Sequence, residues 1–343
     1  MKKIVIHKPG DYKQLKIESC PSLMPGAEDV VVEVKATGIN YADIIIRWGL
    51  YESAKKFVGW PITPGFEYSG IIKRVGNAVT NIKVGDKVFG VSLFNGYASE
   101  VCVPTHQVYS IPQGMTFEEA AGFPAVFMTA YHALLQIVVV RPGMTALIHS
   151  AAGGVGSSLV QLCKIKGIIT IGVVGSSHKI QSLKDLGCDY IIDKSQEDLW
   201  RKVKEYAPNG CDIAFDANGV ETVKESYNHL APSGKLVVYG AHSMFPKKGG
   251  RVNWPKLIYD FLRSPRFNPI NMTSQNKSLI TFNLSFLFDR KDLLSEAMQD
   301  LIQWYKEGKL RAPKITTYPL EDVARAHRDL ESGKTIGKLV LIP

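Results

Sequence analysis

The amino-acid sequence predicts an α/β protein that combines a β-rich domain with a doubly wound parallel-sheet domain. In the middle of the 343 residues, apolar runs of strand length alternate with amphipathic helical stretches and short links. This alternation is typical of a parallel sheet covered by helices. The N-terminal third lacks it, and its apolar runs are separated by Pro-Gly and Asn-Gly pairs, which mark turns. A chain of this length can bury two separate cores.

The N-terminal third contains the predicted β-rich part. Three of its apolar runs read as strands, namely Lys3 to His7, Asp29 to Lys35 and Tyr68 to Val75, because they are rich in β-branched residues and end near turn residues. The stretch Val84-Gly-Asp-Lys-Val-Phe-Gly90 reads as a turn that enters a further strand. We expect these strands to pack into one compact domain.

A strand, a glycine loop, a helix and a second strand follow one another in the middle of the chain. They are Thr145–His149, Ser150–Gly156, Ser157–Lys166 and Ile168–Val174. This order is typical of a site for the pyrophosphate of a dinucleotide, because glycines let backbone N–H groups approach the phosphates at the positive end of the helix. The loop is not a strict G-x-G-x-x-G, since alanine and serine precede its glycines. The flanking elements nevertheless supply the context that the motif requires.

The residues after the second strand indicate which dinucleotide binds. An NAD site places a carboxylate about 20 residues beyond the glycine loop, where it binds the ribose 2′-hydroxyl. Here Gly175 stands at that distance and is followed by Ser176, Ser177 and, two residues later, Lys179. Two hydroxyls and one cation can hold a 2′-phosphate. We therefore predict that the cofactor is NADPH.

The alternation continues beyond this unit to about residue 239. Its predicted elements are a helix at Lys179–Leu186, a strand at Asp189–Asp193, a helix at Gln196–Tyr206, a strand at Asp212–Asp216, a helix at Glu221–Leu230 and a strand at Lys235–Tyr239. Ligand groups should gather at the carboxyl ends of such parallel strands, which here means Gly153–Gly156, Gly175–Lys179, Asn218–Gly219 and Gly240–Ala241. Residues 242–276 receive no assignment. The last predicted elements are a strand at Ser278–Leu284, helices at Leu293–Lys306 and Pro319–Leu330, and a strand at Lys338–Ile342.

Charge and cysteine content narrow the class of protein. The net charge is +9, and its densest basic segment, residues 247–266, interleaves Lys and Arg with aromatic side chains. We interpret this segment as a basic amphipathic loop and helix near the cofactor. We disfavour nucleic-acid binding because no recognition motif accompanies the segment.

Five scattered cysteines exclude a disulfide framework and fit a reducing, cytoplasmic location. No apolar run is long enough to predict a membrane span.

Several motifs resemble the zinc-independent quinone oxidoreductases of the medium-chain dehydrogenase/reductase superfamily, over essentially the full length. They are Gly38-Ile-Asn-Tyr-Ala-Asp43, Arg47-Trp-Gly-Leu-Tyr51, Pro64-Gly-Phe-Glu-Tyr-Ser-Gly70, Val84–Gly90, the glycine loop, and Gly337-Lys-Leu-Val-Leu-Ile-Pro343. Phe282-Asn-Leu284 and the basic segment before it are similar to the branch that contains the synaptic vesicle membrane protein homologues. The resemblance implies a GroES-like β-rich catalytic domain at residues 1–124 and 286–343, and a Rossmann cofactor domain at residues 125–285.

The resemblance also implies that no metal takes part in the reaction. Zinc-dependent relatives place a cysteine and a histidine where this chain has Asn40 and Phe66. Asparagine is a poor zinc ligand and phenylalanine is none. The four-cysteine loop for a structural zinc is missing as well. Glu67 remains, and we interpret it as a structural hydrogen-bonding residue.

By resemblance, the reaction is hydride transfer from NADPH to a quinone or an α,β-unsaturated carbonyl, a small apolar electrophile. Asn40 and Tyr51 are the expected catalytic residues, with Tyr51 either a hydrogen-bond or proton donor or an aromatic wall of the cleft. Lys194 stands where relatives often have a tyrosine near the adenosine phosphate. The expected cofactor contacts are Asn40, Thr129, Gly153, Gly154, Val155, Gly175, Ser176, Lys179, Lys194, Asn218, Gly240, Phe282, Leu284 and Lys338.

Two other functions remain open at this point. The chain can be an NADPH-binding scaffold or sensor with little catalysis, or, more weakly supported, an RNA-binding protein. The resemblance further implies a homodimer, with Lys277–Leu284 as a candidate edge strand that pairs across a two-fold axis.

Overall fold

The computed structural model describes residues 1–246 and 249–343. The chain divides into two compact units, and each is described by itself below. Unit 1 contains Met1–Val126, Lys247–Arg251 and Ser285–Pro343, and unit 2 contains Phe127–Pro246 and Val252–Leu284. The domain bounds that the resemblance implies, 1–124 with 286–343 and 125–285, stay a prediction. Lys247 and Lys248 of the predicted basic segment lie outside the described residues.

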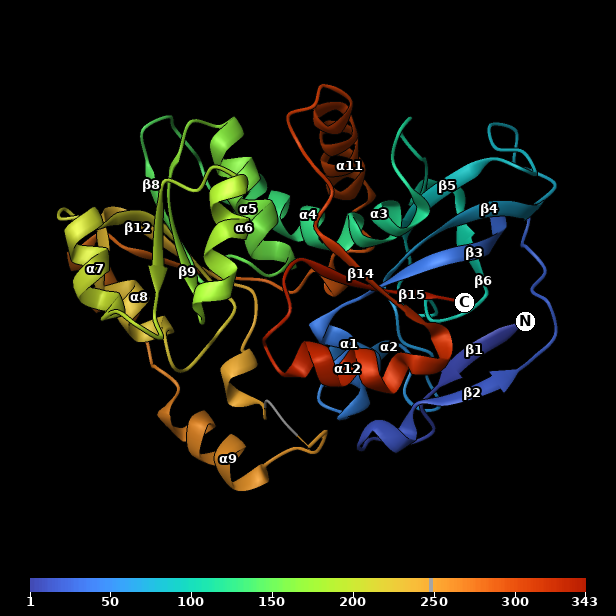
Figure 1. Ribbon diagram of the computed structural model, residues 1–343, viewed down its shortest axis with the longest axis horizontal. Coiled ribbons are helices and arrows are strands. Elements are labelled where there is room, and N and C mark those ends of the chain that lie inside the picture. The colour runs from blue at the N-terminus through green and yellow to red at the C-terminus, as the bar shows by residue number, and fades with distance from the viewer. Residues whose placement is uncertain (247–248) are drawn as a thin grey trace. The chain divides into compact units, whose positions relative to one another are not determined.

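Unit 1 is built on a mainly antiparallel sheet, in which β14 pairs parallel with β15 (Figure 1). Its strand order is β14-β15-β3-β4-β5-β7, and β6 pairs with β3 as well. The strands are β14 (Ile315–Pro319), β15 (Lys338–Ile342), β3 (Asp29–Ile39), β4 (Glu67–Val75), β5 (Lys87–Val91), β6 (Glu100–Pro104) and β7 (Val108–Ser110), with β1 (Lys2–Val5) and β2 (Lys16–Ser19) in a separate hairpin. The helices are α1 (Tyr41–Arg47), α2 (Glu52–Phe57), α3 (Phe117–Gly122), α11 (Lys291–Lys306) and α12 (Val323–Glu331).

Strand β3 is the centre of unit 1, because β4, β6 and β15 all pair with it. Its valines Val30 and Val32 are fully buried and pack with Tyr68 and Ile72 of β4. The strand is longer than expected and runs to Ile39, directly before Asn40. One end of this central strand therefore fixes where the predicted catalytic asparagine lies.

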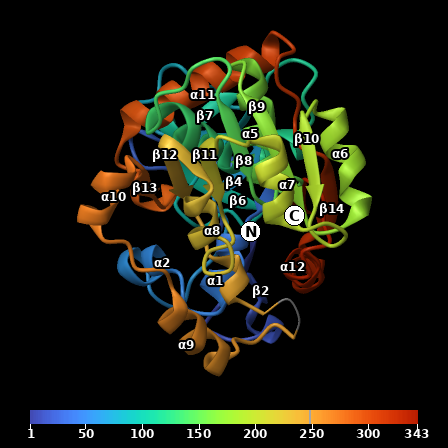
Figure 2. The ribbon, with the colours of Figure 1, turned by 90° about the vertical axis from the view of Figure 1, so that its left-hand side faces the viewer.

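Unit 2 is built on a parallel sheet of order β10-β9-β8-β11-β12-β13 (Figure 2). The strands are β8 (Thr145–Ile148), β9 (Ile169–Val174), β10 (Tyr190–Asp193), β11 (Cys211–Asp216), β12 (Leu230–Val238) and β13 (Ser278–Thr281). The helices are α4 (Pro124–Tyr131), which begins at the end of unit 1, α5 (Gly154–Ile165), α6 (Ile180–Asp185), α7 (Leu199–Tyr206), α8 (Val223–Asn228), α9 (Trp254–Arg263) and α10 (Pro269–Gln275). The strand order reverses between β8 and β11, which is where doubly wound sheets bind ligands.

The structure corrects several predicted boundaries. Helix α7 begins after Asp198, because the Asp198 carboxylate accepts the N–H of Arg201 at 2.8 Å and caps the helix. Strand β13 ends at Thr281, and residues 284–286 form a short 3₁₀ turn instead of continuing the predicted strand. Helix α9 lies in the segment that we interpret from the sequence as a basic amphipathic loop and helix without giving bounds, and α10 was not predicted. An Asn cap followed by proline opens each of them, a recognised start signal. Among the described residues, no helix is both long and apolar enough to cross a membrane.

Candidate active site

The glycine loop of unit 2 joins β8 to α5 at the carboxyl edge of the parallel sheet. Gly153 precedes the helix in extended backbone, and α5 begins at Gly154. In an α-helix the first N–H groups have no acceptor within the helix, so those of Gly154, Val155 and Gly156 are available to an anion. A Cβ on Gly156 would lie 2.4 Å from the Ser150 carbonyl oxygen. Glycine is therefore required for this loop to pack against the strand end.

A polar network fixes the loop to the neighbouring strand end. The Ser150 hydroxyl donates to Asn218 Oδ1 at 3.0 Å, and buried His149 pairs through Nε2 with Ser226 Oγ at 2.8 Å. Asp216 accepts from the N–H groups of Asn218 and Gly219 at 2.8 and 3.0 Å. These bonds hold two of the predicted contact regions, the glycine loop and Asn218, in one arrangement.

The strand ends of β9 and β10 come together where the adenosine phosphate is expected. Lys194 N–H donates to the Val174 carbonyl at 3.0 Å, and a Cβ on Gly175 would lie 3.9 Å from Lys194 Cε. The Lys194 side chain therefore extends along Gly175. Sequence reasoning missed Asp193, whose carboxylate lies at the same edge and accepts from Ser177 Oγ at 2.5 Å and Ser195 Oγ at 2.7 Å. These bonds lower the pKa of Asp193 even though burial raises it.

The other predicted contacts in unit 2 gather at the same edge. Gly240 follows β12, and Phe282 follows β13, where its N–H donates to the Val238 carbonyl at 3.3 Å. The Phe282 ring lies 6.2 Å from Tyr239 and 4.7 Å from His132, measured between ring centroids. Thr129 lies on α4, and Leu284 begins the 3₁₀ turn after β13. The carboxyl edge of the sheet thus presents the predicted phosphate contacts at one part and the Phe282 ring at another.

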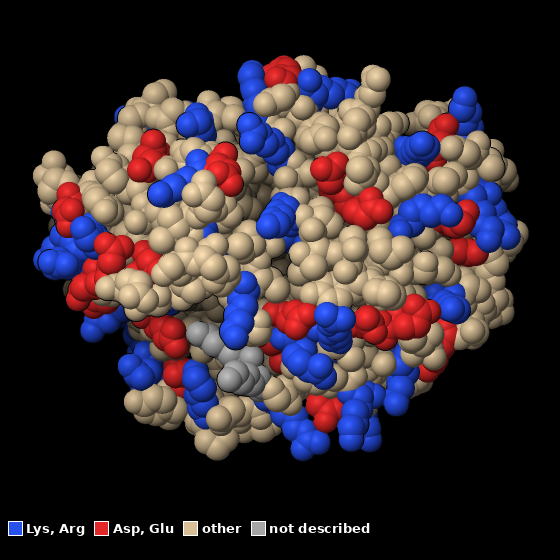
Figure 3. All heavy atoms as spheres, viewed as in Figure 1, with Lys and Arg blue, Asp and Glu red and all other residues tan. Residues whose placement is uncertain are grey.

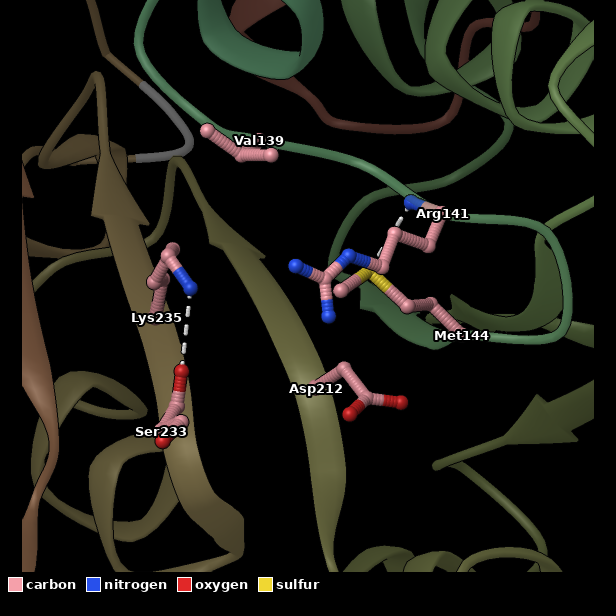
Figure 4. Close-up of a pocket in the computed structure, with 6 residues that line it drawn as sticks. All are labelled: Val139, Arg141, Met144, Asp212, Ser233 and Lys235. Carbon is pink, nitrogen blue, oxygen red and sulfur yellow. Dashed lines mark hydrogen bonds between the residues drawn. The ribbon is translucent and has the colours of Figure 1, made fainter.

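A cavity of about 350 Å³ lies at the opposite, amino edge of this sheet (Figure 4). Its lining residues are Val139, Arg141, Met144, Asp212, Ser233 and Lys235. Asp212 accepts the N–H of Thr145 at 2.8 Å, at the start of β8. None of the predicted site residues lines this cavity, so it is not part of the candidate active site.

In unit 1, three side chains fix Asn40 at the end of β3. Lys338 Nζ donates to Asn40 Oδ1 at 2.5 Å and pairs with Glu67 Oε1 at 2.6 Å. Asn40 Nδ2 donates to the same Glu67 oxygen at 2.9 Å. The side chains of Lys338 and Glu67 are 3% and 0% exposed. The buried ion pair therefore sets the orientation of the Asn40 amide, because its oxygen faces an ammonium group and its nitrogen faces a carboxylate.

Two glycines leave room for this ion pair. A Cβ on Gly38 would lie 2.3 Å from Glu67 Oε1, and one on Gly122 would lie 3.1 Å from Lys338 Cγ. The second Glu67 oxygen accepts the N–H of Ala125 at 2.8 Å. The predicted role of Glu67 as a hydrogen-bonding residue agrees with these contacts.

The donor set around Asn40 does not fit a zinc ion. Of the two positions that carry zinc ligands in zinc-dependent relatives, Asn40 has its oxygen on an ammonium group and Phe66 packs with its ring centroid 5.2 Å from that of Phe94. Zinc sites use thiolate, imidazole and carboxylate ligands, and the Glu67 carboxylate beside the Asn40 amide already pairs with Lys338. Within the described residues, no group of three or more His, Cys, Asp or Glu side chains could hold a metal ion.

Tyr51 lies directly before α2 and is half-buried. Its hydroxyl donates to Ser285 Oγ at 3.3 Å, and Ser285 donates in turn to Ser53 Oγ at 2.8 Å. Its ring meets Phe66 edge to face at 5.8 Å. The Tyr51 ring thus packs beside an apolar cluster, while a chain of hydrogen bonds holds its hydroxyl.

A buried polar chain extends from Asn40 into unit 1. Asp43 accepts the N–H groups of Asn40 and Gly65 at 2.8 and 2.9 Å. It also accepts the Tyr97 hydroxyl at 3.0 Å. Burial raises the pKa of Asp43 to about 7, against the lowering effect of these bonds. Asp43 also has a structural role, because it completes a capping box with Asn40 at the start of α1.

Farther along the same chain, His327 connects Tyr97 to Arg47. His327 Nε2 lies 3.3 Å from the Tyr97 hydroxyl, and Nδ1 lies 3.1 Å from Arg47 Nη1. Arg47 then pairs with Glu331 at 2.5 Å, and both side chains are fully buried. Arg47 therefore has a buried acid partner within unit 1.

Comparisons with known proteins agree with this architecture. Residues 26–130 match the family described as alcohol dehydrogenase GroES-like domain, and residues 186–341 match the family described as zinc-binding dehydrogenase. The synaptic vesicle membrane protein VAT-1 homolog of Danio rerio is 34% identical over 341 residues, which cover 98% of this chain and 69% of that protein.

Two solved structures share the fold over nearly the whole chain. Quinone oxidoreductase of Escherichia coli, solved in complex with NADPH, has a TM-score of 0.86 at 29% identity and covers 100% of both chains. The CurK enoyl reductase has a TM-score of 0.85 at 27% identity, over 99% of this chain and 98% of that one. The predicted fold class, a GroES-like β-rich domain with a Rossmann-type parallel-sheet domain, is confirmed. The chain belongs to the quinone oxidoreductase-like family of the medium-chain dehydrogenase/reductase superfamily.

Proposed function

We propose that this protein is a zinc-independent, NADPH-dependent reductase of quinones or α,β-unsaturated carbonyls. The observation that carries the proposal is the Asn40 amide, which the Lys338–Glu67 ion pair holds in one orientation. A fixed amide N–H stabilises negative charge that develops on a substrate oxygen, because it needs no reorganisation during the reaction. The quinone oxidoreductase and enoyl reductase structures with this fold support the substrate class.

Bound NADPH supplies the hydride, and the residues of this chain orient and stabilise the reacting groups. The N–H groups at the start of α5 bind the pyrophosphate. Asn40 Nδ2 donates a hydrogen bond to the carbonyl or quinone oxygen of the substrate as that oxygen gains negative charge. Tyr51, whose hydroxyl is held by Ser285, supplies the proton or lines the cleft as an apolar wall.

The absence of zinc chemistry is part of the proposal. Simple alcohols and ketones need a Lewis acid to polarise the oxygen, whereas conjugated acceptors are already activated. The Asn40, Phe66 and Lys338 arrangement supports a site that works without a metal. Metal analysis of the purified, active protein tests this, and stoichiometric zinc that is required for turnover contradicts it.

The preference for NADPH rests on the cations at the ends of β9 and β10. Lys194 extends along Gly175, and Lys179 ends the short turn that follows Ser176. Both can approach a 2′-phosphate, and together they outweigh the charge of Asp193. Lys194→Ala and Lys179→Ala should each weaken NADPH binding about tenfold and leave NADH binding unchanged. Lys184→Ala, on exposed helix α6, is the control, and equal dissociation constants for NADPH and NADH in the unchanged protein would refute the preference.

Turnover is tested with a panel of small quinones and enones, followed through the loss of NADPH absorbance without added metal. We expect turnover with conjugated acceptors and none with simple ketones. Asn40→Ala should lower kcat about a hundredfold while the dissociation constant of NADPH changes little. Tight NADPH binding without turnover across the panel would support a cofactor-binding scaffold instead.

We also propose a homodimer formed through β13. This strand is one edge of the described parallel sheet and pairs on its other side with β12. An unpaired edge attracts another strand, and a two-fold axis would place two copies of β13 side by side. Sedimentation of the unchanged protein and of Ile280→Pro tests this, since proline removes a ladder donor. A monomer in the unchanged protein would refute it.

A further inference from the structure

Helix α9 exposes a row of large apolar side chains. The exposed fractions are 56% for Trp254, 58% for Ile258, 71% for Phe261 and 69% for Leu262. These residues have the spacing i, i+4, i+7 and i+8, which places them on one face of a helix. On α10, Ile270 is 76% exposed. Large apolar surface of this kind marks an interaction site in a folded protein.

The opposite face of α9 is polar, and it attaches the helix to its own unit. Asp260 is the buried residue of the helix and forms an ion pair with Lys256. Lys256 Nζ also donates to the Ser243 carbonyl at 2.8 Å, in the turn after β12. In an ordinary surface helix the apolar face packs on the core. In α9 the polar face is anchored, so the apolar face is left for a partner.

The charge around α9 is strongly positive. The sequence of residues 247–277 contains seven Lys and Arg and a single acidic residue, Asp260. Arg263 lies 5.0 Å from the centre of the Tyr259 ring on the exposed surface, and Arg266 is exposed just beyond the helix. Figure 3 shows uncharged surface at the place where Figure 1 draws α9, with both basic and acidic side chains around it.

The partner must therefore accept apolar side chains and carry negative charge. A second copy of this chain is disfavoured, because a two-fold contact through this face would bring the positive charges of both copies together. A nucleic acid would satisfy the charges but not the row of Ile258, Phe261 and Leu262. An anionic lipid surface satisfies both, since apolar and aromatic side chains enter the interface while Arg and Lys contact the headgroups.

We propose that the apolar face of α9, formed by Trp254, Ile258, Phe261 and Leu262, docks the protein on the surface of anionic lipid membranes. The helix is about 15 Å long, so it lies in the interface and does not span the bilayer. Arg263 and Arg266 contribute the attraction to anionic headgroups. This inference does not depend on the proposed reductase activity, because neither the cofactor edge nor Asn40 takes part in it.

The test is co-sedimentation of the full-length protein with vesicles of phosphatidylcholine alone and with about 30% phosphatidylserine, a composition that gives an anionic surface. We expect binding to the anionic vesicles that weakens as salt rises. The variant F261D/L262D should bind at least about tenfold more weakly, from loss of apolar burial. Arg263→Gln and Arg266→Gln should each cost about fivefold.

Val139→Asp is the matched control, because Val139 is 72% exposed on unit 2 at the amino edge of the sheet. It should bind like the unchanged protein. Thermal unfolding of all variants should be unchanged, since the altered side chains are exposed. Brominated lipids should quench part of the tryptophan emission, and Trp254→Phe should remove that quenching.

Four results would overturn the proposal. The first is vesicle binding that is absent at low salt, or equal for neutral and anionic lipid. The second is a change of oligomeric state in F261D/L262D with vesicle binding intact, which would assign the face to a second copy. The third is binding of single-stranded RNA that depends on Arg263 and Arg266 while vesicles do not bind. A large loss of stability in F261D/L262D would show that the chain itself covers this face.

Discussion

Replacement of Lys338 by methionine tests whether the buried ion pair acts through Asn40. The change removes an ammonium group that is 3% exposed and 2.6 Å from Glu67, and it leaves the fully buried Glu67 carboxylate without a counter-charge. Removing one partner of a buried ion pair costs about 3–5 kcal/mol. For a unit of this size, that corresponds to a fall in melting temperature on the order of 10 °C.

Loss of the ammonium group also removes the charged donor from Asn40 Oδ1. A hydrogen bond to a charged group contributes about 1.5–3 kcal/mol. If the transition state uses the oriented amide, kcat should fall about 10- to 100-fold. The dissociation constant of NADPH should change less, since the phosphate-binding groups lie on unit 2. Lys338→Arg, which keeps the charge, should restore part of the activity.

The assay is a double-mutant cycle with Lys338→Met and Glu67→Gln, read by urea unfolding and by steady-state kinetics. The double variant should be more stable than Lys338→Met alone, because no unpaired charge remains buried. Lys16→Met, on the exposed strand β2, is the control and should behave like the unchanged protein. Activity of Lys338→Met within twofold of the unchanged protein, or additive effects of the two substitutions, would refute the reasoning.

Three further substitutions test other parts of the structure. Gly156→Ala places a Cβ 2.4 Å from the Ser150 carbonyl oxygen, so NADPH affinity in a fluorescence titration should fall at least about tenfold. Burial raises the pKa of Asp43 to about 7, so the free energy that its protonated form contributes to folding is present below pH 4 and is lost as the pH rises through 7. Asp43→Asn should remove this pH dependence, which amounts to up to about 4 kcal/mol in the free energy of urea unfolding. An unchanged pH profile would contradict this expectation. The pKa of Glu100 shifts in the opposite direction: despite burial, the hydrogen bonds from Lys73, Ser22 and the Leu23 N–H lower it to about 2. The contribution of Glu100 to the free energy of unfolding is therefore present above pH 4.5 and lost toward pH 2. Glu100→Gln should cost about 2 kcal/mol at pH 7 and nothing near pH 2.

The parallel sheet of unit 2 was predictable because each of its elements carries a local signal. The apolar runs, the glycine stops and the short links specify strand, helix and connection one by one. The residues at its carboxyl edge follow from the topology, since parallel strands end together. The bounds of α9 could not be predicted, because its apolar face is exposed and its pattern reads as neither a core helix nor a loop, and α10 was missed.

The contacts of unit 1 could not be predicted from local patterns. Lys338 and Asn40 are separated by almost the whole chain, and only the pairing of β15 with β3 brings them together. The same holds for Arg47 and His327, which meet through α1 and α12. Asp193 was overlooked for a different reason, because the search for a carboxylate followed β9 and the residue lies on the neighbouring strand β10.

The charges of Lys338 and Glu67 beside Asn40 bear on which substrates the proposed reductase can accept. Lys338 and Glu67 together are neutral, so their burial is tolerated, and a divalent ion beside the Lys338 ammonium would meet a like charge. In the proposed reaction, the positive charge of Lys338 would act on the substrate only through the Asn40 amide, which would polarise an oxygen much less than a directly bound Zn²⁺ does. An alcohol or an unconjugated ketone therefore gains too little stabilisation. A quinone or enone spreads the developing charge over its own conjugated system, and we expect such acceptors to be the ones that a fixed amide suffices to reduce.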